Sequence, residues 1–106
     1  MSTRATIAYA KSDGSYQATY LHFDGYPEHA GSILSQRYNT IERVSALIAG
    51  GDLRSLSSNQ EEPEYFPNAL PPRLLHDCAS LLVYARNCDA NFLYVFEDNH
   101  WRCLKF

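Results

Sequence analysis

Two histidines and two carboxylates stand close together in the stretch HFDGYPEHAGSIL, and they are the residues of this chain best suited to chemistry. Nitrogen and oxygen atoms that bind divalent metals or move protons are carried by His22, Asp24, Glu28 and His29. Their spacing argues against a metal site, because a turn from a strand into a helix would separate the two histidines. We therefore predict that no metal binds here.

The same stretch fits a strand that turns into a helix. Asp24-Gly25 is typical of a turn, and Pro27 suits the first position of a helix, where its missing N–H costs nothing. We expect Asp24 to accept hydrogen bonds from backbone N–H groups, and Glu28 to lie near the positive end of the helix dipole. The predicted structural motif has seven members: His22, Asp24, Gly25, Tyr26, Pro27, Glu28 and His29.

The other potential nucleophiles and ligands do not form a recognisable active site. His76 and Cys78 are two residues apart, so their side chains would point to different sides of a helix. Three cysteines at wide spacing (Cys78, Cys88 and Cys103) do not suit zinc, and we expect them to be reduced, at least two of them packed as small apolar residues. There is no phosphate-binding loop and no dinucleotide fingerprint. We expect neither enzymatic activity nor a cofactor.

Charge and composition restrict the partners. Only 9 of the 106 residues are Lys or Arg, they are dispersed, and the formal net charge is −3. DNA-binding proteins use basic residues to displace counterions from phosphates, so we expect no direct nucleic-acid binding, whether sequence-specific or not. A partner with a basic surface fits better. No apolar run approaches the roughly 20 residues that span a bilayer, and the N-terminus does not resemble a signal peptide, so we expect a cytoplasmic protein.

The N-terminal part predicts a β-hairpin. Residues 6–10 and 16–21 are rich in strand-forming residues and flank Asp13-Gly14, which is typical of a two-residue type I′ turn. With that turn, Ile7 would share a face of the sheet with Ala18.

Helical and strand patterns alternate along the rest of the chain. We expect helices over 28–38 and 41–48, the second of which is capped by Asn39 and ended by Gly50-Gly51. A short extended piece over 52–56 follows, and then a helix over 71–87, for which a strand over SLLVYAR is the alternative. The last elements are strands over 92–96 and 101–104. This ββααxαββ order predicts a single α+β domain over residues 1–106. Its antiparallel sheet would carry helices packed on one face.

An acidic, proline-rich loop over residues 57–70 contains the candidate partner-binding residues. They are three glutamates and two neighbouring aromatics: Glu61, Glu62, Glu64, Tyr65 and Phe66. The glutamates are not expected to be neutralised locally, because the nearest basic residues in the sequence are Arg54 and Arg73. The aromatic pair either plugs its own domain or anchors a partner, and the sequence leaves both alternatives open.

The element YLHFDGYPEHAGSIL, followed by Tyr38 and the segment LIAGGDLRSL, resembles a family of small, mostly uncharacterised proteins of tailed bacteriophages and prophages. That family combines a dGS-type hairpin, an H-x-DGYPEH-x-G-x-x-L element and a Tyr-x-Tyr-Leu-Phe…Trp finish, which Leu93-Tyr94-Val95-Phe96 and Trp101 resemble. The resemblance covers residues 3–56 and 91–103, while the middle of the chain departs from the family. It implies a phage or mobile-element origin but brings no established activity.

Taken together, the residues and the resemblance favour a protein that acts by stoichiometric binding. The leading hypothesis is a phage anti-defence protein, in its sharpest form an inhibitor of a CRISPR–Cas effector complex, which occludes a basic nucleic-acid-handling surface in the bacterial host cell. The second is an accessory protein of phage DNA metabolism or regulation that binds a phage partner. The third is a small enzyme or metal protein that uses His22, Asp24 and His29.

Overall fold

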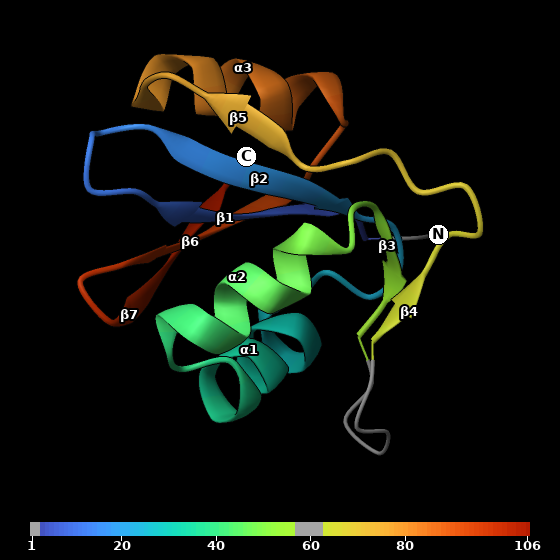
Figure 1. Cartoon of the computed structure of the whole chain (residues 1–106). Coiled ribbons are helices and arrows are strands. Elements are labelled where there is room, and N and C mark those ends of the chain that lie inside the picture. Colours follow the sequence, from blue (N-terminus) through green and yellow to red (C-terminus); the bar gives the residue numbers. More distant parts are fainter. Residues whose placement is uncertain (1–2, 57–62) are drawn as a thin grey trace.

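The computed structural model describes residues 3–56 and 63–106, which form one sheet with helices on both faces (Figure 1). The strands are β1 (Ala5–Ala10), β2 (Tyr16–Leu21), β3 (Leu53–Ser55), β4 (Glu64–Tyr65), β5 (Arg73–Leu75), β6 (Phe92–Glu97) and β7 (His100–Lys105). The helical elements are η1 (Pro27–Gly31), which is a π-helical turn, and the α-helices α1 (Ser32–Arg37), α2 (Ile41–Ala49) and α3 (Cys78–Asn87). None of the helices in this part of the chain is both long enough and apolar enough to span a bilayer.

The sheet is mixed, with the strand order β4-β3-β2-β1-β6-β7 and with β5 pairing β2. Its central strand, β1, pairs antiparallel with β2 and parallel with β6, where Ile7 lies opposite Tyr94. The α+β class is confirmed, but the prediction of an antiparallel sheet is wrong. A parallel pair needs a long crossover connection, and the chain between the two hairpins supplies it.

Alternate residues of the central strands contribute to two cores, one on each face of the sheet. Ile7 and Tyr94 belong to the core that contains buried residues of α1 and α2, whereas Ala8 and Leu93 belong to the core that contains those of α3. The prediction that the helices cover one face is therefore wrong. Strands buried on both faces read as continuous apolar runs, and the run FLYVF in β6 has this pattern.

The first hairpin is confirmed, but its register differs by one residue from the predicted one. A three-residue loop follows Lys11, and Gly14 within it has a φ of +89°. Ile7 consequently pairs with Thr19, and it does not share a face with Ala18. A one-residue shift in a strand exchanges its two faces, so the choice between a two-residue and a three-residue turn decides which side chains meet each helix layer.

The helical segment between β2 and β3 begins and ends near the predicted positions. Pro27 is the first residue of η1, which leads directly into α1. The cap of α2 is Thr40 rather than Asn39, because the Thr40 side chain accepts a hydrogen bond from the Arg43 N–H at 3.3 Å. Gly51, with a φ of +88°, follows the end of α2, as expected for a helix stop.

The predicted helix over residues 71–87 divides into β5 and α3. Residues Arg73–Leu75 pair antiparallel with β2, which the sequence had not indicated. Asp77 then caps α3 by accepting a hydrogen bond from the Ser80 N–H at 2.8 Å, and the hydrogen bonds from Ser80 hold the pKa of Asp77 below its usual value. The helix alternative is thus confirmed over Cys78–Asn87, and the strand alternative over SLLVYAR is wrong.

The three cysteines are free thiols. Cys78 and Cys103 are exposed, and Cys88 is half-buried at the end of α3. The expectation that at least two of them pack as small apolar residues is therefore wrong.

Candidate functional site

The DGYPEH turn (residues 24–29), which contains every member of the predicted motif except His22, forms a joint between β1, β2 and β6. The Gly25 N–H donates to the Thr3 carbonyl oxygen at 2.8 Å, and the Gly25 carbonyl oxygen accepts a hydrogen bond from the Tyr94 hydroxyl at 2.6 Å. A Cβ at position 25 would come within 2.8 Å of the Ala5 Cβ, so glycine is needed for this close approach. The buried Tyr94 hydroxyl thereby ties the turn to a strand near the other end of the chain.

Asp24 precedes this joint and does not cap the helix. Its φ is +55°, in the left-handed region, which aspartate tolerates better than most residues. Its exposed side chain makes no hydrogen bond to another described residue. The predicted capping role is therefore wrong. The N-cap residue of η1 is Tyr26, whose carbonyl oxygen accepts hydrogen bonds from the N–H groups of His29 and Ala30.

The two histidines of the motif contact separate neighbours. His22 Nδ1 lies 2.6 Å from the Tyr20 hydroxyl oxygen. His29 Nε2 lies 3.0 Å from the Leu56 carbonyl oxygen, to which it donates. Within residues 3–56 and 63–106, no group of three or more His, Cys, Asp or Glu side chains is placed to hold a metal ion. The structure does not bring His22, Asp24 and His29 together in one site.

Three residues of the turn are exposed, two of them acidic and one aromatic. They are Asp24, Tyr26 and Glu28, and we refer to them as the exposed turn surface. Glu28 lies in the first helical turn, as predicted. Neither carboxylate has an ion-pair partner in the described part of the chain. Tyr26, which is 38% exposed, has a ring contact with His29 at 5.9 Å between centroids.

Of the predicted acidic loop over residues 57–70, the structure describes residues 63–70. Glu61 and Glu62 lie outside the described residues. Glu64 begins β4 and forms an ion pair with Arg54 of β3, with Nε 3.5 Å from Oε1. The expectation that Glu64 is not neutralised locally is therefore wrong. The pairing of β3 with β4 brings Arg54 close, although ten positions separate the two residues in the sequence.

Tyr65 and Phe66 pack against their own domain. The Tyr65 hydroxyl donates to the Leu47 carbonyl oxygen at 2.6 Å, and a Cβ at position 50 would overlap its half-buried ring. The half-buried Phe66 ring lies 5.7 Å from the ring of His22. Of the two alternatives that the sequence left open for this pair, these contacts support packing within the domain.

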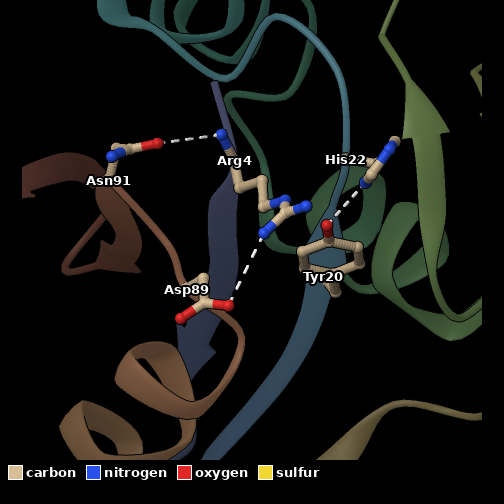
Figure 2. Close-up of polar contacts among 5 residues, drawn as sticks. All are labelled: Arg4, Tyr20, His22, Asp89 and Asn91. Atoms are coloured by element: carbon tan, nitrogen blue, oxygen red, sulfur yellow. Dashed lines mark hydrogen bonds and ion pairs between the residues drawn. The ribbon is translucent and has the colours of Figure 1, made fainter. Parts of the chain in front are cut away.

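A second group of polar side chains, not identified from the sequence, lies where β1 and β6 begin and β2 ends. Figure 2 shows Arg4 beside Asp89, with Nη1 3.5 Å from the Asp89 Oδ2, and the Arg4 backbone N–H donating to the Asn91 Oδ1 at 3.2 Å. Arg4 Nε is buried without a hydrogen-bond partner in the described residues. On the neighbouring strand, the Tyr20 hydroxyl points toward His22.

Tyr20 also borders a pocket of about 200 Å³ between β2, β5 and α3, which we refer to as the β2–α3 pocket. Its lining combines two phenols, a carboxylate, a guanidinium group, a thiol and an aliphatic side chain: Tyr20, Tyr84, Asp52, Arg73, Cys88 and Leu70. Burial raises the pKa of Tyr20, of Tyr84 and of Cys88. These groups therefore stay protonated at neutral pH, where they serve better as neutral hydrogen-bonding groups than as nucleophiles.

Sequence reasoning missed this pocket because its residues are far apart in the chain. The pairing of Ala18 with Arg73 brings β5 beside β2, and this strand was expected to be part of a helix. The one local signal is the spacing of Tyr84 and Cys88, since residues at i and i+4 lie on the same face of a helix.

No family model, curated protein or solved structure matches this chain. The resemblance to phage proteins stays a prediction, and the function has to be argued from the side chains themselves.

Proposed function

We propose that this chain is a small binding protein that associates stoichiometrically with a macromolecular partner through the exposed turn surface. The partner presents a basic surface of the kind that handles nucleic acid. One observation carries this proposal: the most distinctive element of the sequence exposes two carboxylates without ion-pair partners and a tyrosine on a single turn.

The physical properties of this surface suit binding. Exposed carboxylates steer an acidic protein toward a basic surface and raise the association rate. Tyrosine is enriched among interface hot spots, because it adds a large contact area and a polar tip. The joint at Gly25 holds the turn in place through hydrogen bonds to Thr3 and Tyr94, so little conformational entropy is lost on binding.

The acidic loop extends the proposal. His29 in the turn contacts the carbonyl oxygen of Leu56, from which the chain leads toward Glu61 and Glu62 in the sequence. These two glutamates remain sequence-based candidates for the same partner. Glu64 contributes less to charge steering, since it already pairs with Arg54.

The sharpest form of the proposal is a phage anti-defence protein that occludes a CRISPR–Cas effector complex in the bacterial cytoplasm. Its support is the resemblance to phage proteins together with the net charge of −3. The alternative, an accessory protein of phage DNA metabolism, uses the same surface and differs in its partner.

Affinity capture from bacterial lysates, with and without phage infection, tests the proposal. The test variant combines Asp24→Asn with Glu28→Gln, because asparagine also tolerates the left-handed conformation of residue 24. The matched control combines Asp98→Asn, at another exposed left-handed aspartate, with Glu42→Gln, in the first turn of α2.

We expect the wild type and the control to retain one defined complex at low salt, and the test variant to lose it. High salt should release the complex, because exposed charges are screened. Equal capture by the test variant, or no enrichment over an unrelated acidic protein, would contradict the proposal. For a captured effector complex, target-DNA binding should fall in proportion to the added chain and reach its minimum near equimolar ratio.

A further inference from the structure

The β2–α3 pocket lies on the α3 side of the sheet, whereas the exposed turn surface belongs to an element that packs on the α1 and α2 side. It therefore calls for a function of its own. We propose that this pocket binds a free L-amino acid with an uncharged side chain, its ammonium group against Asp52 and its carboxylate against Arg73.

The argument begins with the two charges of opposite sign on the pocket wall. Neither the Asp52 carboxylate nor the Arg73 guanidinium group makes an ion pair or a side-chain hydrogen bond with another residue in the described ranges. Asp52 is half-buried and Arg73 is exposed, so water reaches the guanidinium group in the absence of a ligand. A ligand with one charge would pair with only one of them. A zwitterion satisfies both through charge-assisted hydrogen bonds, which are the strong ones.

The neutral polar groups of the pocket suit the same ligand. Burial raises the pKa of the Tyr84 phenol, and its hydrogen bond with Cys88 adds to the shift, so at neutral pH this group is a hydroxyl. It can donate to a ligand carboxylate by exchanging Cys88 for the ligand. The Tyr20 hydroxyl, also on the pocket wall, is already engaged with His22 Nδ1 at 2.6 Å, which orients its ring. The pocket thus offers the ligand a donor without adding a third charge.

Size and apolar lining limit the ligand further. The pocket of about 200 Å³ is smaller than the roughly 300–1,000 Å³ that is typical of sites for drug-sized ligands. Leu70 and the two tyrosine rings supply an apolar wall for a short side chain. A nucleotide carries no ammonium group and would leave Asp52 without an ion-pair partner.

Protection of Cys88 from alkylation provides the first test. Cys88 lines the pocket, whereas the exposed Cys78 stands at the other end of α3 and does not line it. The full chain is treated with iodoacetamide at mildly alkaline pH, because the raised pKa of Cys88 keeps its thiol protonated at neutral pH. Each uncharged L-amino acid is added in turn, and both sites are followed by mass spectrometry. At about 10 mM, which reveals millimolar dissociation constants, at least one amino acid should slow alkylation of Cys88 severalfold and leave Cys78 unchanged. If none does, the proposal is wrong.

Calorimetry with truncated ligands then tests the roles of the two charges. The carboxylic acid without the amino group and the amine without the carboxylate should each bind about tenfold more weakly, or worse, than the protecting amino acid. The Asp52→Asn variant should bind the amino acid no more tightly than the acid that lacks the amino group. The Arg73→Gln variant should bind the amino acid no more tightly than the amine that lacks the carboxylate.

The matched control is Arg54→Gln, at an exposed arginine that does not line the pocket, and it should change neither preference. Equal binding of the truncated ligands to the wild type would overturn the proposal even if a variant failed to fold. Since these measurements use the chain alone, their failure would leave the proposed partner binding untouched.

Discussion

The DGYPEH turn and the β2–α3 pocket contain similar kinds of side chains, but the chain assembles them in opposite ways. In the turn and the two residues before it, acids and histidines are neighbours in the sequence and diverge in space, with His22 on Tyr20 and His29 on Leu56. In the pocket, the side chains are scattered from position 20 to position 88 and converge. A high local density of reactive residue types is therefore a poor guide to a site, because strand pairing decides which side chains meet.

Three glycine-to-alanine substitutions should produce the largest effects. Two of them compare the backbones of the two regions, and the third, at Gly14 in the first hairpin, serves as a reference. Gly51, beside the pocket, has a φ of +88°, and a Cβ there would overlap the Leu70 carbonyl oxygen. Strain and clash together should cost on the order of 4 kcal/mol. Gly25, in the turn, has no positive φ, and a Cβ there would clash with the Ala5 Cβ at 2.8 Å and the Thr3 carbonyl oxygen at 2.9 Å, so its substitution should cost about 1–3 kcal/mol. Gly14 has positive φ but open space, so its substitution should cost about 1–2 kcal/mol.

Urea unfolding of the three variants gives these free energies directly. We expect the backbone beside the pocket to be more tightly constrained than the backbone of the turn. If Gly25→Ala lowers the free energy of unfolding more than Gly51→Ala does, that order is wrong.

Tyr94→Phe and Tyr65→Phe test whether the turn joint contributes more to the free energy of unfolding than the packing of β4 does. Both hydroxyls donate to a backbone carbonyl at 2.6 Å. Tyr94 is 2% exposed, so its loss leaves the Gly25 carbonyl buried without that donor and should cost about 1–3 kcal/mol. Tyr65 is half-buried, and its loss should cost about 0.5–1.5 kcal/mol. If the Tyr94→Phe variant is as stable as the wild type in urea, the hydrogen bond between Tyr94 and Gly25 does not stabilise the protein as we expect.

Substitutions at Asp24 separate a left-handed backbone role from a capping role. With a φ of +55°, Asp24→Ala and Asp24→Ser should each cost about 1 kcal/mol, while Asp24→Gly should stay within ~0.5 kcal/mol of the wild type. Serine is as good a cap as aspartate. A thermal melt in which serine preserves stability and alanine does not would therefore restore the capping role.

The smallest expected effect is the pH dependence that Asp77 gives to α3, the helix that carries Tyr84. Hydrogen bonds from Ser80 lower the pKa of Asp77 in the folded state. Its stabilising contribution is therefore fully present above the ordinary pKa of an unfolded aspartate. It is lost as the pH falls through the lowered folded value. Asp77→Asn keeps a capping side chain without this titration, so its melting temperature should drop less than that of the wild type below about pH 4. A difference in melting temperature between the two proteins that stays the same at all pH values would contradict this prediction.

The elements that the sequence predicted well depend on local patterns. The strands β1 and β2, the helices α2 and α3, and the β6–β7 hairpin follow from alternation, helical periodicity and turn residues. What could not be predicted depends on contacts between distant segments. The residues Arg73–Leu75 become a strand because β2 is available to pair with them. The pairing of β1 with β6 has no local signal.

The candidate site shows the same division. Gly25 packs closely against Ala5 of β1, and Asp24 beside it takes a left-handed backbone conformation; no spacing rule reveals this packing. The ion pair of Glu64 with Arg54 likewise depends on the pairing of β3 with β4. The pocket escaped prediction for the same reason, since its two charges come from Asp52 and Arg73 on opposite sides of the acidic loop.

The most direct test of the central claim measures the affinity of the captured partner for the Asp24→Asn, Glu28→Gln variant, together with the free energy of unfolding of that variant. If these exposed side chains serve binding and the inward residues hold the turn, affinity at low salt should fall at least about tenfold. The free energy of unfolding should stay within ~0.5 kcal/mol of the wild type, because exposed charges contribute little to stability. Wild-type affinity in this variant, or a loss of affinity accompanied by a matching loss of stability, would contradict the account.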